Sequence, residues 1–233
     1  MTALTNKQYT SSVGQKFNPD GSPREFHGNT VIFHIPRDSA TFDLLLRVRK
    51  ETESQPWARK FSFLPPSSYH MTIFEGVCDQ VREPAKWTSK LPLDAPLERV
   101  DDLLRQAWSD VSIPRDVSMS YRLYNAAIGN ISIYVKANTH EMARKLRSYR
   151  DRLSDAFGIR ASNHDNYAFH ITLAYRIEAL TISETFQAIW FSRRMHRDLR
   201  RSFGTLQINA PELTFFADMT CFASTRPEFP VTL

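Results

Sequence analysis

The chain has 233 residues, of which 42% are hydrophobic and 24% are charged, and its formal net charge is +5 with a pI of about 9.3. This composition is ordinary for a globular protein with a sizeable core, and no apolar run approaches the ~18 residues that a transmembrane helix needs. The excess of basic residues mildly favours an anionic substrate or partner, but it is far smaller than that of a nucleic-acid-binding arm.

The N-terminal residues 1–27 are polar and contain turn-forming residues, which is typical of a tail or an extended cover. Residues 1–18 lack the apolar stretch of a secretory signal, so we expect a cytoplasmic protein with no membrane contact and no obligate protein partner. The chain contains two cysteines, Cys78 and Cys221. In a chain of this length they are more typical of free thiols in a reducing compartment than of a disulfide framework.

The first predicted elements are a strand, a helix and a second strand. A short apolar strand is expected over residues 30–35, and Asp38 or Ser39 can cap a helix that runs to about residue 50. A proline-containing loop then leads to a strand at residues 68–74, which is rich in aromatic and β-branched side chains.

The rest of the chain continues with further helices and strands after an irregular stretch that contains several prolines. Apolar residues recur at helical spacing over residues 97–108, and alternation predicts strands at 119–124 and 131–135. The remaining expected elements are a helix capped by Asn138 or Thr139 and stopped by Gly158, a strand at 168–174, a long helix that begins with the capping box Thr181-x-x-Glu184 and ends near Phe203, and closing strands at 213–217 and 221–223.

The same short motif occurs on two of these strands. Residues 68–74 read Ser-Tyr-His-Met-Thr-Ile-Phe, and residues 168–174 read Ala-Phe-His-Ile-Thr-Leu-Ala. Because strand side chains alternate, the His and Thr of each copy share one face, and the apolar residues beside them point into a core. A Gly-Asn strand and a helix precede both copies, so the order repeats over residues 28–76 and 129–176. This repeat predicts two related lobes that face each other across a cleft.

At these residues the sequence resembles the 2H phosphoesterase superfamily, whose members carry two His-x-Thr/Ser-x motifs. The motifs stand here as His70-Met71-Thr72-Ile73 and His170-Ile171-Thr172-Leu173. The wider family includes LigT-type RNA 2′,3′-cyclic phosphodiesterases, and this chain looks most like a little-characterised bacterial branch. The resemblance covers roughly residues 28–224. It implies a single α+β domain over residues 28–233, with a bilobal 2H phosphoesterase-like fold of two pseudo-symmetric sheet-plus-helix lobes around a central cleft.

The resemblance also implies a reaction that needs neither metal nor cofactor, with His70 and His170 as the catalytic histidines and Thr72 and Thr172 as hydroxyls that contact the phosphate. Opening a cyclic phosphate requires a base that deprotonates water and an acid that protonates the leaving oxygen, and two histidines can take these roles near neutral pH. Two hydroxyls can stabilise the charge on the non-bridging oxygens. The sequence leaves open which histidine is the base.

Four further residues are candidates for substrate binding. Strand alternation predicts that Phe74 and Arg176 share the faces of the two motifs, where Phe74 could flank a base or ribose and Arg176 could contact a phosphate. Tyr124 and Tyr134 are candidates for stacking on a base. The seven histidines show no His-x-x-x-His spacing and the cysteines no Cys-x-x-Cys spacing, so we expect no metal site.

A single His-x-Thr on a strand is usually only a polar strand face, but its duplication within a repeat favours catalysis. We therefore expect a phosphoesterase that hydrolyses a 2′,3′-cyclic phosphate on a nucleotide or an RNA end. The alternative is a non-catalytic nucleotide- or RNA-binding protein that uses the same cleft, which the basic helix face at residues 193–201 favours.

Overall fold

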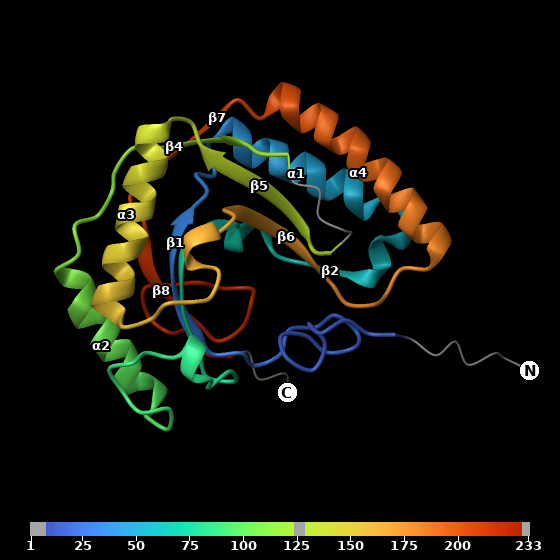
Figure 1. Ribbon diagram of the computed structural model, residues 1–233. Helices are drawn as coiled ribbons and strands as arrows, with labels where there is room; N and C mark the ends of the chain where they lie inside the picture. Colours follow the sequence, from blue (N-terminus) through green and yellow to red (C-terminus); the bar gives the residue numbers. More distant parts are fainter. Residues whose placement is uncertain (1–7, 124–128, 230–233) are drawn as a thin grey trace, which may run out of the picture.

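The computed structural model describes residues 8–123 and 129–229, and these residues form an α+β fold built on one curled antiparallel sheet (Figure 1). The strands follow the order β7-β4-β5-β6-β3-β1-β8, and β2 pairs with β6 beside this path. In chain order they are β1 (Gly28–His34), β2 (Phe61–Phe63), β3 (His70–Cys78), β4 (Val117–Tyr121), β5 (Ile131–Ala137), β6 (His170–Arg176), β7 (Thr205–Ile208) and β8 (Glu212–Phe216). The predicted α+β class is confirmed.

The sheet has two halves that meet where β3 pairs with β6, through the register pair Met71 and Ile171. The first half contains β8, β1 and β3, and the second contains β6, β5, β4 and β7. In each predicted repeat the opening strand pairs with the motif strand, β1 with β3 and β5 with β6. The two motif strands therefore lie at the centre of the sheet, one from each half.

The α-helices of the described residues lie in two pairs on the sheet (Figure 1). They are α1 (Ala40–Glu53), α2 (Leu97–Ser109), α3 (His140–Phe157) and α4 (Ile182–Ser202). The α3 residue Phe157 packs on Phe74 of β3, with ring centroids 5.8 Å apart. Val48 of α1 borders a small buried cavity with Ile133 of β5 and Phe191 of α4. Each repeat thus places its helix on the other half of the sheet, whereas the sequence suggested that each lobe keeps its own helix.

The helix ends follow from local sequence signals. The Ser39 hydroxyl accepts a hydrogen bond from the Phe42 amide at the start of α1, and Thr139 accepts one from Met142 at the start of α3. Gly158 ends α3 in the left-handed region, with φ of 67°, where a Cβ would be strained. The capping box of Thr181 and Glu184 is present at α4.

Three short elements differ from the sequence prediction. β2 and β7 were not expected, and the closing strand expected at residues 221–223 is reduced to one bridge between Phe215 and Ala223. The isolated pattern of a three- or four-residue strand is too short to be recognised without its pairing partner.

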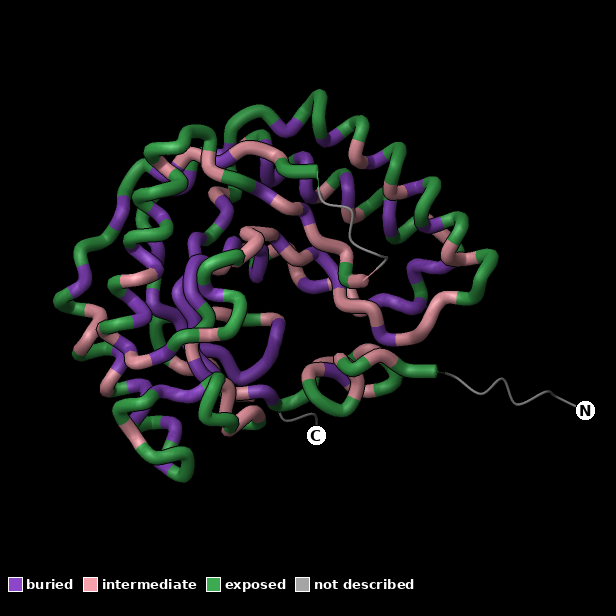
Figure 2. Tube along the Cα trace, viewed as in Figure 1, coloured by how far each residue is buried: buried purple, intermediate pink, exposed green. Residues whose placement is uncertain are grey.

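Buried residues follow the strands and the inner faces of the helices (Figure 2). The N-terminal segment, residues 8–27, also packs onto the sheet, where Phe17 is 1% exposed and its ring lies 5.1 Å from that of Tyr175. The amide of Phe26 donates to the carbonyl of Ala217, just after β8. Among the described residues, no helix is both long and apolar enough to cross a membrane.

Candidate active site

The two motifs meet at the centre of the sheet, on a single face. Met71 and Ile171 form the register pair between β3 and β6, and both are 0% exposed. Because side chains alternate along a strand, the His and Thr on either side of each point to the opposite face. All four side chains, His70, Thr72, His170 and Thr172, line one cavity of about 280 Å³.

The antiparallel register sets which motif residues face each other. Because β3 and β6 are antiparallel, the residue before Met71 pairs with the residue after Ile171, and the residue after Met71 pairs with the residue before Ile171. His70 therefore lies across from Thr172, and Thr72 lies across from His170. Each half of the floor of the cavity offers one imidazole and one hydroxyl, and the two halves are related by an approximate two-fold axis.

Both imidazoles are held in the same way. The distance from Nδ1 of His70 to the carbonyl oxygen of Ser68 is 2.7 Å, and that from Nδ1 of His170 to the carbonyl oxygen of Ala168 is 2.8 Å. A carbonyl oxygen only accepts, so Nδ1 of each ring carries a proton and donates it. This bond orients the ring and leaves Nε2 as the atom available for proton transfer.

The two rings have different surroundings. His70 lies against Phe222, with ring centroids 4.3 Å apart, and His170 lies 5.4 Å from the ring of Tyr134. Burial lowers the pKa of His70 to about 4, and repulsion from His34 and His170 adds to this effect, while the bond to Ser68 opposes it. His70 is therefore a neutral imidazole at neutral pH, with a free lone pair on Nε2.

Each threonine also has a polar neighbour beside the cavity. The hydroxyl oxygens of Thr172 and Ser132 are 3.2 Å apart. Thr72 and Tyr167 line the cavity together, and burial raises the pKa of the Tyr167 phenol, which keeps it protonated. Neither Tyr167 nor Ser132 was predicted from the sequence to belong to the site. Their only sequence signal is their place, three residues before the second motif for Tyr167 and on the neighbouring strand for Ser132.

Two β-bulges change the faces expected for Phe74 and Arg176. The register shifts between Val31↔Phe74 and Ile32↔Thr72, which leaves Ile73 as an extra residue, and Leu173 is extra at the equivalent place in β6. A bulge inserts one residue and so reverses the alternation beyond it. Glu75 and Tyr175 consequently line the cavity.

The bulge places Phe74 in the core, contrary to the face expected from alternation. It is 2% exposed and contacts Phe157 and His164. Arg176 is likewise absent from the described residues that line the cavity, where Tyr175 takes the position expected for it. Tyr134 is adjacent to His170, whereas Tyr124 lies outside the described residues.

The walls of the cavity come from both ends of the chain. Lys16 and Phe26 belong to the N-terminal segment, and Met219 and Phe222 follow β8. These residues are far from both motifs in the sequence, so their place in the site could not be predicted from it.

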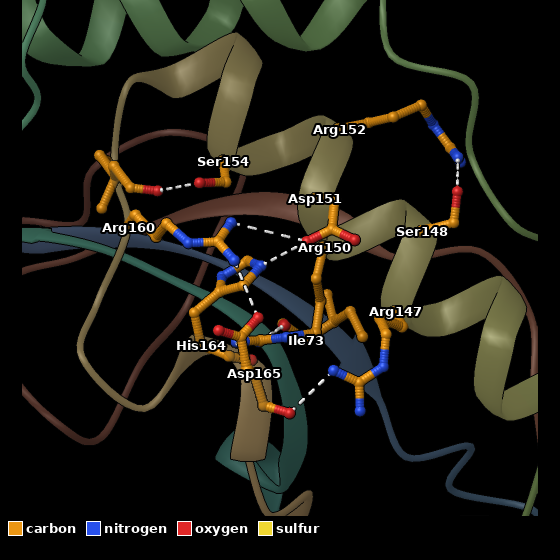
Figure 3. A network of polar contacts seen from close by, with 11 residues as sticks. Ile73, Arg147, Ser148, Arg150, Asp151, Arg152, Ser154, Arg160, His164 and Asp165 are labelled. Carbon is orange, nitrogen blue, oxygen red and sulfur yellow. Dashed lines mark hydrogen bonds and ion pairs between the residues drawn. The ribbon is translucent and has the colours of Figure 1, made fainter.

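A polar network beneath β3 holds the first motif strand (Figure 3). The buried guanidinium of Arg150 donates to the carbonyls of Ile73 and His164, and lies 4.4 Å from the ring centroid of Tyr167. Arg150 thus supports both the bulge and the ring of Tyr167.

The same network contains a group of potential metal ligands, Asp151, His164 and Asp165. Nε2 of His164 lies 2.9 Å from Asp151, and the guanidinium of Arg160 lies 3.6 Å from Asp151 and 2.8 Å from Asp165. Arg160 pairs with both carboxylates, an arrangement that is typical of a structural ion-pair network.

Comparisons with solved structures support the fold. The crystal structure of the conserved protein of unknown function ATU0111 from Agrobacterium tumefaciens is similar, with 28% identity, coverage of 95% of this chain and 94% of that chain, and a TM-score of 0.84. TT0787 of Thermus thermophilus is 13% identical over 80% of this chain and 85% of that chain, with a TM-score of 0.37. The second likeness is too weak to carry an argument.

Comparison at the level of sequence finds a similarity to one family. No curated protein matches this sequence. Residues 16–129 match the model of a 2H phosphodiesterase family that is described as a domain of unknown function (DUF1868), and this range contains the first motif. Over residues 16–129, the chain is therefore similar to the 2H phosphodiesterase family.

Proposed function

We propose that the protein is a metal-independent phosphodiesterase that hydrolyses a 2′,3′-cyclic phosphate on a nucleotide or an RNA end. The observation that supports the proposal is that two imidazoles and two hydroxyls line one cavity. The Nδ1 atom of each imidazole donates to a main-chain carbonyl, which leaves both Nε2 atoms available. A binding protein would need no such pair of oriented proton carriers.

The lowered pKa of His70 favours the role of general base for this residue. Its neutral Nε2 removes a proton from a water molecule, and the water oxygen forms the new bond to phosphorus. His170, in the acid role, gives a proton from Nε2 to the leaving ribose oxygen as the bond from that oxygen to phosphorus breaks. The product is a phosphomonoester with a free neighbouring hydroxyl.

Thr72 and Thr172 stabilise the charge that develops during this step. Their hydroxyls donate to the non-bridging phosphate oxygens, and Ser132 keeps the hydroxyl of Thr172 in place. Donors that are positioned before the reaction need no reorganisation when the charge appears, which makes them effective in catalysis.

The test is turnover of 2′,3′-cyclic nucleotides and of a short RNA with a cyclic phosphate end, measured in EDTA. We expect the wild type to turn over at least one of them, and His70→Ala and His170→Ala each to lose about 10²- to 10⁴-fold in rate, as expected for loss of a general acid or base. His140→Ala is the matched control, because this histidine is exposed on α3. Full activity in both motif variants would refute the mechanism, and binding without turnover would favour the non-catalytic alternative.

We propose that the enzyme acts in the cytoplasm. Its binding partner is its substrate, a nucleotide or an RNA end. The free thiols of Cys78 and Cys221 support a reducing compartment.

A further inference from the structure

The cavity contains a cation that neither motif supplies. Among the described residues that line it, Lys16 is the single lysine or arginine. Its Nζ lies 5.3 Å from the ring centroid of Phe26 and 5.1 Å from that of Tyr175. Aromatic faces attract a cation without neutralising its charge, so this ammonium group remains available to an anion.

The main chain holds Lys16 in this position. Its amide donates to the carbonyl of Ser12 over 3.0 Å, and its own carbonyl accepts from the amide of Arg24 over 2.9 Å. The next residue, Phe17, is buried and packs on Tyr175. A cation with its backbone fixed in advance loses little freedom when a ligand binds.

The two terminal segments close the walls of the cavity around this position. Phe26 packs on Phe216, with ring centroids 6.4 Å apart, and Phe222 packs on both Phe216 and His70. Figure 1 shows the N-terminal segment in blue and the loop after β8 in red near one another, and the bond between Phe26 and Ala217 joins them. The resulting walls are aromatic, which suits the flat ring of a nucleobase.

Size and charge both favour a small ligand. A cavity volume of about 280 Å³ lies just below the range of typical ligand pockets, which is about 300 to 1,000 Å³. Glu75 also lines the cavity, and its carboxylate repels any ligand that spreads many phosphates over the site. A polyanionic chain would therefore gain little from this site, whereas a ligand with one phosphate can approach Lys16 and avoid Glu75.

We infer that Lys16 is a substrate-contacting residue, and that the site takes a mononucleotide-sized cyclic phosphodiester in preference to the end of a long RNA. This inference rests on the proposed function and names its substrate class. Lys16 attracts the negative charge of the nucleotide, while the rings of Phe26, Tyr175 and Phe222 enclose its base.

The inference is tested by binding, which needs no turnover. Calorimetric titration with adenosine 3′-monophosphate compares the wild type with Lys16→Met, Lys16→Arg and the control Lys145→Met, whose lysine is exposed on α3. We expect Lys16→Met to raise the Kd by about 10- to 100-fold, the effect of one lost hydrogen bond to a charged group. Lys16→Arg should keep most of the affinity, and Lys145→Met all of it. Circular dichroism checks that each variant is folded.

A second titration uses a ten-nucleotide RNA with a 3′-phosphate. We expect it to bind at least about tenfold more weakly than the mononucleotide, at low and at physiological salt. Unchanged affinity in Lys16→Met, tighter binding of the RNA, or no binding of the mononucleotide by the wild type would each overturn the inference. Binding by the wild type does not depend on turnover, so a failure of catalysis alone would count against the proposed function and leave the inference standing.

Discussion

The neutral state of His70 predicts a specific loss of stability in acid. Burial lowers its pKa in the folded protein to about 4, against 6.5 for the ordinary side chain. Between these two pH values the unfolded chain binds a proton that the folded protein does not, so unfolding becomes easier as the pH falls. The contribution is fully present above pH 6.5 and is lost as the pH falls toward 4.

The expected magnitude follows from the same two values. At 1.36 kcal/mol per pH unit, the difference between 6.5 and about 4 corresponds to about 3 kcal/mol in the free energy of unfolding. The perturbation that isolates it is His70→Asn. The asparagine amide can take the place of Nδ1 and donate to the carbonyl of Ser68, but it does not titrate.

The assay is urea unfolding of the wild type and His70→Asn at several pH values from 7.5 to 4. The free energy of unfolding of the wild type should fall by about 3 kcal/mol more than that of the variant across this range. Groups that do not interact with His70 titrate equally in both proteins and cancel in the difference, whereas His34 and His170 are coupled to it. His140→Asn, at an exposed position on α3, should follow the wild type. Parallel curves for the wild type and His70→Asn would refute the claim that burial keeps this imidazole neutral.

Four other substitutions test the site and its support. Thr72→Val and Thr172→Val should each lower kcat by about 10²-fold with little change in KM, because the hydroxyls act mainly on the transition state; an effect confined to KM would contradict this role. Arg150→Met should lower the free energy of unfolding by about 2–4 kcal/mol in urea titrations, because two buried main-chain carbonyls lose a charged donor, and a loss below 1 kcal/mol would count against this support. Gly76→Ala should destabilise by about 3 kcal/mol in thermal melting, because its Cβ would lie 2.0 Å from Oδ1 and 2.5 Å from the main-chain oxygen of Asn29; an unchanged Tm would show that β1 and β3 can separate there.

Much of the secondary structure was readable from local patterns. The helix caps at Ser39, Thr139 and Thr181 and the stop at Gly158 were expected from single residues, and the structure confirms them. A cap is a contact between residues three or four apart, so the sequence contains both partners. The sharing of one cavity by the two motifs was also expected, from the repeat.

The candidate site was predicted less completely, and the errors have a common cause. Strand alternation assigned Phe74 and Arg176 to the cavity, but the bulges at Ile73 and Leu173 reverse the alternation there. A bulge is a property of the register between two strands, and the sequence of one strand does not contain it. Because the bulges cannot be recognised in the sequence, the position of Tyr175 on the cavity face could not be predicted.

The sequence by itself determined the components: two strands that each place a histidine and a threonine on one face, and the helices that follow their opening strands. These depend on the two-residue and 3.6-residue periods, which are local. Only the tertiary structure decided how they combine. Pairing at Met71 and Ile171 brought the motifs together, the helices crossed to opposite halves of the sheet, and Lys16 and Phe222 arrived from the two ends of the chain. The lowered pKa of His70 was also decided by the tertiary structure, because it depends on burial by residues that are distant in sequence.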